Sequence, residues 1–171
     1  VGRPAPPNLA SRAAQEESQA AMRYAIRLLA RQDRTTAELA QRLRRRCFAP
    51  EAVATVLSRL TRQGYLDDAK HAERLVNDRL TRNPHGRRAI EWMLRKKGVP
   101  GDIIQTCLDR HFQGVDETQM ATELARRRLQ RLRGLDEARV RNRLASFLSR
   151  RGFDYEAVRC ALDRVLPDAD E

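Results

Sequence analysis

One nine-residue pattern, repeated four times along this chain, limits what the chain can fold into. The pattern is Leu, then Arg or Lys two positions later, then Gly or Cys, a large apolar residue, and an acid three positions after that. Basic side chains suit the negative end of a helix dipole, glycine suits the left-handed position after a helix, and an acid suits the next first turn. Each copy therefore predicts the end of one helix and the start of another. The copies are residues 43–51, 60–68, 94–102 and 148–156.

Three of these copies lie within a longer repeat. Leu43, Leu94 and Leu148 are each followed fourteen positions later by another leucine, and they are spaced by 51 and then 54 residues. Each repeat has room for three short helices, and no segment shows the alternation of a strand. We therefore predict an all-α fold of three tandem three-helix, helix-turn-helix-like repeats that form an elongated array. The predicted repeats are residues 19–66, 67–115 and 116–166.

Local signals place some helix ends within the first repeat. Thr35 and Glu38 have the spacing of a capping box, which predicts that a helix begins beside them. Pro50 suits the first position of the next helix, because its fixed φ is helical and its missing N–H is not needed there. Cys47 stands where the other three copies of the pattern have glycine.

The two ends of the chain differ from the repeats in composition. Residues 1–8 are rich in proline and lack the basic and apolar regions of a signal peptide. No apolar run approaches the roughly 18 to 20 residues of a membrane span. We expect a cytoplasmic protein without a membrane partner, with a disordered leader over residues 1–18 and a frayed acidic tail over residues 167–171.

The sequence lacks the patterns of the common enzyme classes. It has no P-loop, no dinucleotide-binding glycine pattern, no HExxH and no GxSxG. Its three cysteines form neither a disulfide framework nor a CxxC metal pair, so we expect buried free thiols at Cys47, Cys107 and Cys160. We therefore predict no catalytic residues, no cofactor and no metal site.

The formal net charge is +11, and the basic residues cluster around the second helix of each predicted repeat. One interpretation is that these clusters are only solvated helix faces and dipole partners. Their recurrence in all three repeats, with few acids to offset them, favours a surface for an anionic partner such as single- or double-stranded DNA. The predicted contact residues are Arg42, Arg45, Arg46, Arg87, Arg88, Lys96, Lys97, Arg127, Arg128, Arg131, Arg150 and Arg151.

With these repeats and clusters, the chain resembles the RecX family of RecA regulators. The first repeat resembles the family's Ser-x-x-Glu-Leu and Gly-Tyr-Leu-Asn-Asp segments, and it departs from them at Thr36, Asp67 and Cys47. The second repeat resembles the family's Gly-basic and Leu-x-x-Lys-Gly-Ile segments. The matching residues are Thr36-Ala37-Glu38-Leu39, Arg42-Leu43, Gly64-Tyr65-Leu66-Asp67-Asp68 and Ala72, then Gly86-Arg87-Arg88, Leu94, Lys97 and Gly98-Val99.

The resemblance implies a fold and a partner. Family members are curved arrays of three-helix repeats that lie in the groove of the RecA–DNA filament. They suppress its ATPase, strand-exchange and coprotease activities. By this resemblance the chain is a non-enzymatic negative modulator of RecA. We expect a monomer, although the joints between repeats would also permit a dimer formed by helix exchange.

Two other classes of function remain open on the sequence. Residues 35–65 are similar to a winged-helix core, which favours a helix-turn-helix transcription regulator, but a helix rather than a hairpin wing is expected after Tyr65. A protein-binding scaffold would fit the helical repeats and leave the net charge unexplained.

Overall fold

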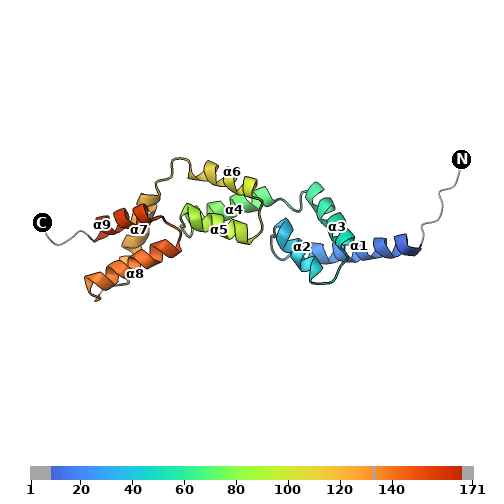
Figure 1. The fold of residues 1–171 in the computed structure, drawn as a ribbon, viewed down its shortest axis with the longest axis horizontal. Helices are drawn as coiled ribbons and strands as arrows, with labels where there is room; N and C mark the ends of the chain where they lie inside the picture. Colours follow the sequence, from blue (N-terminus) through green and yellow to red (C-terminus); the bar gives the residue numbers. More distant parts are fainter. Residues whose placement is uncertain (1–8, 133, 167–171) are drawn as a thin grey trace. The chain divides into compact units, whose positions relative to one another are not determined.

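A computed structural model describes residues 9–132 and 134–166 of the chain (Figure 1). Within these residues the regular structure is entirely α-helical, as the repeat pattern predicts. The helices are α1 (Leu9–Leu29), α2 (Thr36–Arg44), α3 (Pro50–Arg62), α4 (Asp68–Thr81), α5 (Arg87–Lys96), α6 (Gly101–Phe112), α7 (Glu117–Leu129), α8 (Glu137–Arg150) and α9 (Tyr155–Val165).

The four copies of the nine-residue pattern all end a helix in the left-handed conformation. The φ angle is 76° at Gly64, 74° at Gly98 and 81° at Gly152, and Cys47 adopts 59° although it carries a side chain. After α3, the amide of Tyr65 donates to the Leu60 carbonyl at 2.9 Å, and Gly64 donates to Thr61 at 3.0 Å. These two bonds form a Schellman motif, which satisfies carbonyls that the helix end leaves unpaired.

Helix starts are fixed by side-chain caps. The predicted capping box is confirmed: the amide of Glu38 donates to Thr35 Oγ1 at 3.1 Å, and the Thr35 amide donates to the Glu38 carboxylate at the same distance. Asp136 and Asp154 cap α8 and α9 by accepting from amides of their first turns at 2.9 and 2.7 Å. Pro50 is the first residue of α3, as predicted.

The helices fall into two compact units, each of which is described by itself. Unit 1 contains residues up to 71 together with 97–100, and unit 2 contains residues 72–96 together with residues from 101 onward. The turn at 97–100 belongs to the second repeat by sequence but packs with the first. This division does not coincide with the three predicted repeats.

Each unit has an apolar core built from leucine, valine and alanine. In unit 1, α1, α2 and α3 pack around fully buried Leu39, Leu43 and Leu60. In unit 2, α7, α8 and α9 pack around Leu144, Leu148 and Ala161. The apolar residues of the repeat pattern are therefore the ones that hold the helices of each unit together.

Three details differ from the sequence expectations. The disordered leader has to be shortened, because α1 begins at Leu9. Residues 9–18 contain several alanines, which favour helix, and the Glu17 carboxylate accepts a hydrogen bond from the Ala49 amide at 2.7 Å.

The cysteines are the second difference. Cys47 is exposed and Cys160 half-buried, so buried thiols are confirmed only for Cys107. Residues 1–8 and the predicted tail at 167–171 lie outside the described residues.

Tyr65 is the third difference. Its backbone forms the Schellman bond, but its side chain is 69% exposed, whereas the neighbouring Leu66 is only 2% exposed and joins the core of unit 1. The apolar residue that packs after this helix end is thus Leu66 and not Tyr65, the large apolar residue of the repeated pattern. Helix α4 begins at Asp68, so no hairpin wing follows this segment.

Candidate nucleic-acid interface

The turns of the repeated pattern hold the starts of α2 and α5 by equivalent bonds. In unit 1, Thr35 Oγ1 donates to the Lys97 carbonyl at 2.6 Å, and the Thr36 amide donates to the Asp68 carboxylate at 2.8 Å. Lys97 Nζ also lies 3.0 Å from a Glu38 carboxylate oxygen. We call this set the first turn contact. It joins residues far apart in the sequence and uses one predicted DNA-binding residue, Lys97, to do so.

Unit 2 repeats the arrangement at corresponding positions. The Gly86 amide donates to the Arg151 carbonyl at 2.8 Å, and the Arg87 amide donates to the Glu117 carboxylate at 2.9 Å. The Arg151 guanidinium donates to Asn83 Oδ1 at 2.7 Å and to the Pro84 carbonyl at 2.8 Å. We call this set the second turn contact. Its Arg151, like Lys97, takes part in holding the fold.

Glycine is required where these turns approach a neighbouring helix start. A Cβ at Gly98 would lie 2.4 Å from the Ala37 Cβ, and one at Gly152 would lie 2.3 Å from the Ala89 amide nitrogen. A Cβ at Gly86 would lie 2.4 Å from the Gly152 carbonyl oxygen. Real side chains do not tolerate such distances, so these glycines permit the close backbone contact.

The two turn contacts place their acids in different electrostatic settings. At Glu38, burial raises the pKa, but the bonds from Lys97 and from the Thr35 amide outweigh it and lower the pKa overall. At Glu117, burial is the largest effect and raises the pKa, although the Arg87 amide opposes it. Burial also lowers the pKa of Arg151, with repulsion from Arg128 and Arg79 as a smaller cause.

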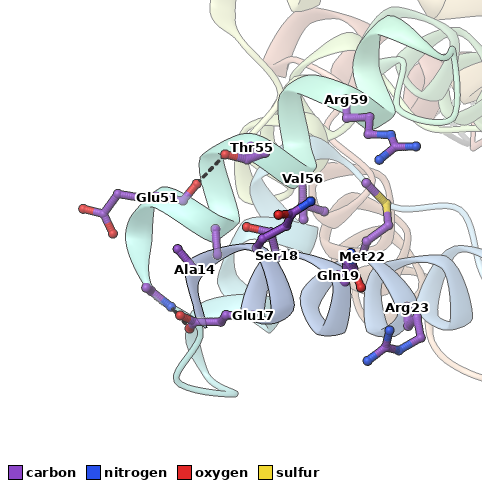
Figure 2. A pocket seen from close by; sticks show the side chains of 13 residues that line it. Ala14, Glu17, Ser18, Gln19, Met22, Arg23, Glu51, Thr55, Val56 and Arg59 are labelled. Carbon is purple, nitrogen blue, oxygen red and sulfur yellow. Dashed lines mark hydrogen bonds between the residues drawn. The ribbon is translucent and has the colours of Figure 1, made fainter. Parts of the chain in front are cut away.

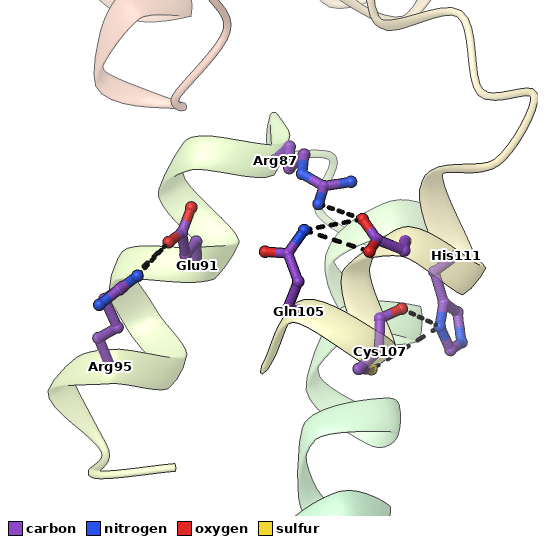
Figure 3. Close-up of polar contacts among 7 residues, drawn as sticks. Arg87, Glu91, Arg95, Gln105, Cys107 and His111 are labelled. Atoms are coloured by element: carbon purple, nitrogen blue, oxygen red, sulfur yellow. Dashed lines mark hydrogen bonds and ion pairs between the residues drawn. The ribbon is translucent and has the colours of Figure 1, made fainter. Parts of the chain in front are cut away.

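Arg87 is a further predicted contact residue whose charge is engaged. Its guanidinium lies 2.5 Å from the Asp109 carboxylate, and Gln105 donates to the same carboxylate at 3.0 Å (Figure 3). The pKa of Asp109 is lowered chiefly by the bond from Arg87. Figure 3 also shows His111 beside Cys107, whose thiol pKa is raised by burial, as suits an unreactive thiol.

The other predicted residues are exposed. In unit 1, Arg42 and Arg45 form no ion pair with any described residue, and the Arg46 guanidinium lies 5.1 Å from the centre of the Tyr24 ring. These residues lie at the end of α2 or directly after it. Unit 1 therefore carries one compact group of available cations.

The remaining exposed residues of the predicted set lie in unit 2. Arg128 and Arg151 both contact the Phe147 ring, at 5.3 and 4.9 Å from its centre. Lys96 Nζ lies 4.9 Å from the centre of the Trp92 ring. Arg127 lies 3.9 Å from Glu123. Both side chains are exposed, so this ion pair leaves the charge of Arg127 in contact with solvent. The exposed predicted residues of this unit are Arg88, Lys96, Arg127, Arg128, Arg131 and Arg150.

Unit 2 has a groove between α5, α8 and α9 that the sequence did not predict. Arg88 and Arg150 line it, together with the exposed aromatic rings of Trp92 and Tyr155. Tyr155 follows the capping residue Asp154 at the first position of α9, where a side chain has little protein around it. That position was the only sequence signal for its exposure. The groove lies wholly within unit 2.

A second hollow lies in unit 1 between α1 and α3 (Figure 2). Its Glu17 carboxylate is used to hold the Ala49 amide, and Thr55 donates to the Glu51 carbonyl at 2.8 Å. Among the described residues no group of His, Cys, Asp or Glu is arranged to hold a metal ion. None of the described helices is both long and apolar enough to cross a membrane.

The fold and its turn contacts define a class of protein, a tandem helical repeat in which each repeat is a three-helix domain. Three models of one family match in order: "RecX, first three-helix domain" over residues 21–60, the second over 67–108 and the third over 116–162. The chain belongs to the RecX family of regulatory proteins. This agrees with the prediction of a regulator rather than an enzyme.

Relatives from several bacteria support this assignment. The chain is similar to Regulatory protein RecX of Pelodictyon phaeoclathratiforme, with 34% identity over 88% of this chain and 92% of the relative. It is also similar to Regulatory protein RecX of Amycolatopsis mediterranei, with 40% identity over 74% of this chain and 71% of the relative.

Two crystal structures share the fold. The crystal structure of RecX from Lactobacillus salivarius aligns with a TM-score of 0.72 at 19% identity, covering 88% of this chain and 97% of that one. A crystal structure of regulatory protein RecX aligns with a TM-score of 0.76 at 21% identity, covering 95% of this chain and 81% of that one.

Proposed function

We propose that this chain is a negative modulator of RecA in the cytoplasm. It binds in the groove of the RecA–DNA filament and inhibits ATP hydrolysis, strand exchange and coprotease activity. Through these activities it affects recombinational repair and the SOS response. The observation that carries the proposal is the ordered match of all three RecX three-helix domains across the chain.

The exposed cations of both units support a role for DNA phosphates in this binding. Arg42 and Arg45 in unit 1, and Arg88 and Arg150 in unit 2, form no ion pair with a described residue. Cations that are exposed and unpaired can exchange their counterions for phosphates at little cost. Lys97 and Arg151 contribute indirectly, by holding the turns that position their neighbours.

The first test is ATP hydrolysis by RecA on single-stranded DNA, with this protein added at and below one copy per RecA protomer. We expect inhibition, because a protein that occupies the filament groove contacts several protomers and gains avidity. Inhibition well below one copy per protomer would indicate action at filament ends. Full hydrolysis at every ratio, despite binding to single strands, would refute the proposal.

Charge-reversal variants make the test specific. Lys96→Glu with Arg150→Glu should weaken inhibition, since both side chains are exposed and neither holds a turn contact. Arg12→Glu, an exposed residue of α1 outside the predicted set, is the matched control and should inhibit like the unmodified protein. Unchanged helicity by circular dichroism must accompany both results.

A further inference from the structure

We propose that the groove between α5, α8 and α9 binds single-stranded DNA by stacking bases on Trp92 and Tyr155. This inference deepens the proposed function and rests on it for the choice of DNA as the ligand. It assigns the groove to unpaired bases, whereas the basic clusters alone account only for phosphates.

The rings lie in solvent although the same unit buries another aromatic ring. Trp92 is 60% exposed and Tyr155 is 81% exposed, whereas Phe153, in the turn before α9, is 4% exposed. Leaving a large apolar ring in water forgoes the stabilisation that burial would give. Both rings line the same groove, and each can offer one face to a flat ligand there, with Lys96 over the other side of Trp92. A base offers such a face, and each stacked base strengthens binding about tenfold.

The charges around the groove select an anion. Its lining contains Arg88, Arg141, Arg150 and Arg159, with Asp163 as its single acid. Asp163 lies 3.2 Å from Arg141, and Arg159 lies 3.7 Å from Glu156, so these two arginines already have acidic neighbours. Arg88 and Arg150 form no ion pair with a described residue. Lys96 adds a cation over the ring of Trp92, one of the two aromatic residues that line the groove.

Cations beside exposed rings fit a single strand better than a duplex or an acidic peptide. A duplex keeps its bases stacked on one another and would leave both rings without a partner. An acidic peptide would use the arginines but has no flat groups to cover Trp92 and Tyr155. The second turn contact adjoins the groove, because Gly152 and Ala89, whose backbones approach each other closely, both line it.

Trp92 is the only tryptophan in the chain, so its fluorescence reports on the groove. We would titrate the full chain, without RecA, with oligothymidylate and with an abasic oligomer of the same length. Stacking predicts quenching by oligothymidylate and affinity about a hundredfold higher than for the abasic chain, a factor of about ten for each of the two rings. Equal affinity and equal quenching with the two oligomers would overturn the proposal. Equal quenching by poly-glutamate would also overturn it, in favour of an acidic peptide site.

A pair of tyrosine variants gives an independent readout. Tyr155→Ala should weaken oligothymidylate binding about tenfold while leaving affinity for the abasic oligomer unchanged. Tyr65→Ala, which removes an equally polar ring exposed in unit 1, is the matched control and should leave both affinities unchanged. If Tyr155→Ala binds oligothymidylate like the unmodified chain, stacking on this ring is excluded.

The outcomes separate this inference from the proposed function. Inhibition of RecA by a chain that shows no base-dependent quenching would overturn the groove assignment and leave the RecA proposal standing. Base-dependent quenching by a chain that never inhibits RecA would support the groove and overturn the RecA proposal.

Discussion

Gly98 and Gly64 have nearly the same backbone conformation in very different surroundings. Their φ angles are 74° and 76°, and both end a helix of the repeated pattern. A Cβ at Gly64 would meet no described atom within 4 Å, whereas one at Gly98 would lie 2.4 Å from the Ala37 Cβ. Comparison of these two residues therefore separates the cost of left-handed backbone from the cost of a close approach.

We predict that Gly64→Ala lowers the free energy of unfolding by about 1 kcal/mol, the cost of a left-handed residue with a side chain. Gly98→Ala should lower it by about 2–4 kcal/mol, because the added methyl also overlaps Ala37. Urea unfolding followed by circular dichroism measures both. Adding Ala37→Gly to Gly98→Ala should restore part of the loss. Equal losses for the two single variants would show that the turn at Gly98 is not tightly packed.

Residue type predicted the backbone at these positions but not the side-chain environments. Glycine at three copies of the pattern, and Cys47 at the fourth, mark positive φ because the pattern places each directly after a helix end. Exposure at Tyr65 and Tyr155 depends on what lies across from each ring, which is set by distant segments. Local sequence carries no information on those neighbours.

At the scale of elements, the starts of α2 and α5 are held by acids from the first turns of α4 and α7. Asp68 accepts from the Thr36 amide, and Glu117 accepts from the Arg87 amide. A carboxylate beside a helix N-terminus is favoured by the dipole, yet burial raises the pKa of Glu117. Burial of this carboxylate therefore outweighs the bond that it accepts.

Stability should depend on pH through Glu117. Because its pKa is raised in the folded chain, the folded state binds the proton more tightly than the unfolded state does. The contribution of Glu117 to stability is therefore greatest in acid. It falls as pH rises from the unfolded pKa, about 4.3, through the raised folded value. Glu117→Gln removes this titration but keeps an oxygen that can accept from the Arg87 amide.

The measurement is the free energy of unfolding of the unmodified chain and of Glu117→Gln between pH 4 and pH 8. We expect the unmodified chain to lose stability relative to the variant as pH rises, and the difference then to become constant. Glu117→Ala is the control for the hydrogen bond and should be less stable than Glu117→Gln at every pH. A difference that grows in the opposite direction would mean that the carboxylate is stabilised in its charged form.

The turn contacts give two members of the predicted binding set, Lys97 and Arg151, a structural role that the sequence did not indicate. Helix ends, caps and the order of the helices follow from short-range patterns, and the structure agrees with those predictions. Lys97 and Arg151 occupy equivalent places after α5 and α8, where dipole partners are common. The Lys97 ammonium donates to Glu38 and the Arg151 guanidinium donates to Asn83, positions 59 and 68 residues away. Nothing in the local pattern distinguishes such a cation from one that faces solvent.

At the scale of the whole molecule, the net charge of +11 is distributed over both units. Unit 1 offers Arg42 and Arg45, and unit 2 offers Arg88 and Arg150, none of them ion-paired with a described residue. If one single strand contacts both units, the phosphate contacts of the two pairs add. If only one unit binds the strand, the other pair has no effect on the salt dependence of binding.

The slope of log affinity against log salt measures this directly for a long oligothymidylate. Each lost phosphate contact should reduce the magnitude of the slope by about 0.7 on a single strand. Replacing Arg42 and Arg45 by Ala should therefore reduce it by about 1.4, and replacing Arg88 and Arg150 should do the same. The four-residue variant should lose about twice as much, while Arg12→Ala should leave the slope unchanged. If the slope of the four-residue variant falls no further than that of one two-residue variant, a single unit carries the strand. Contacts from both units to one strand would add, and the slope would then fall by the sum of the two.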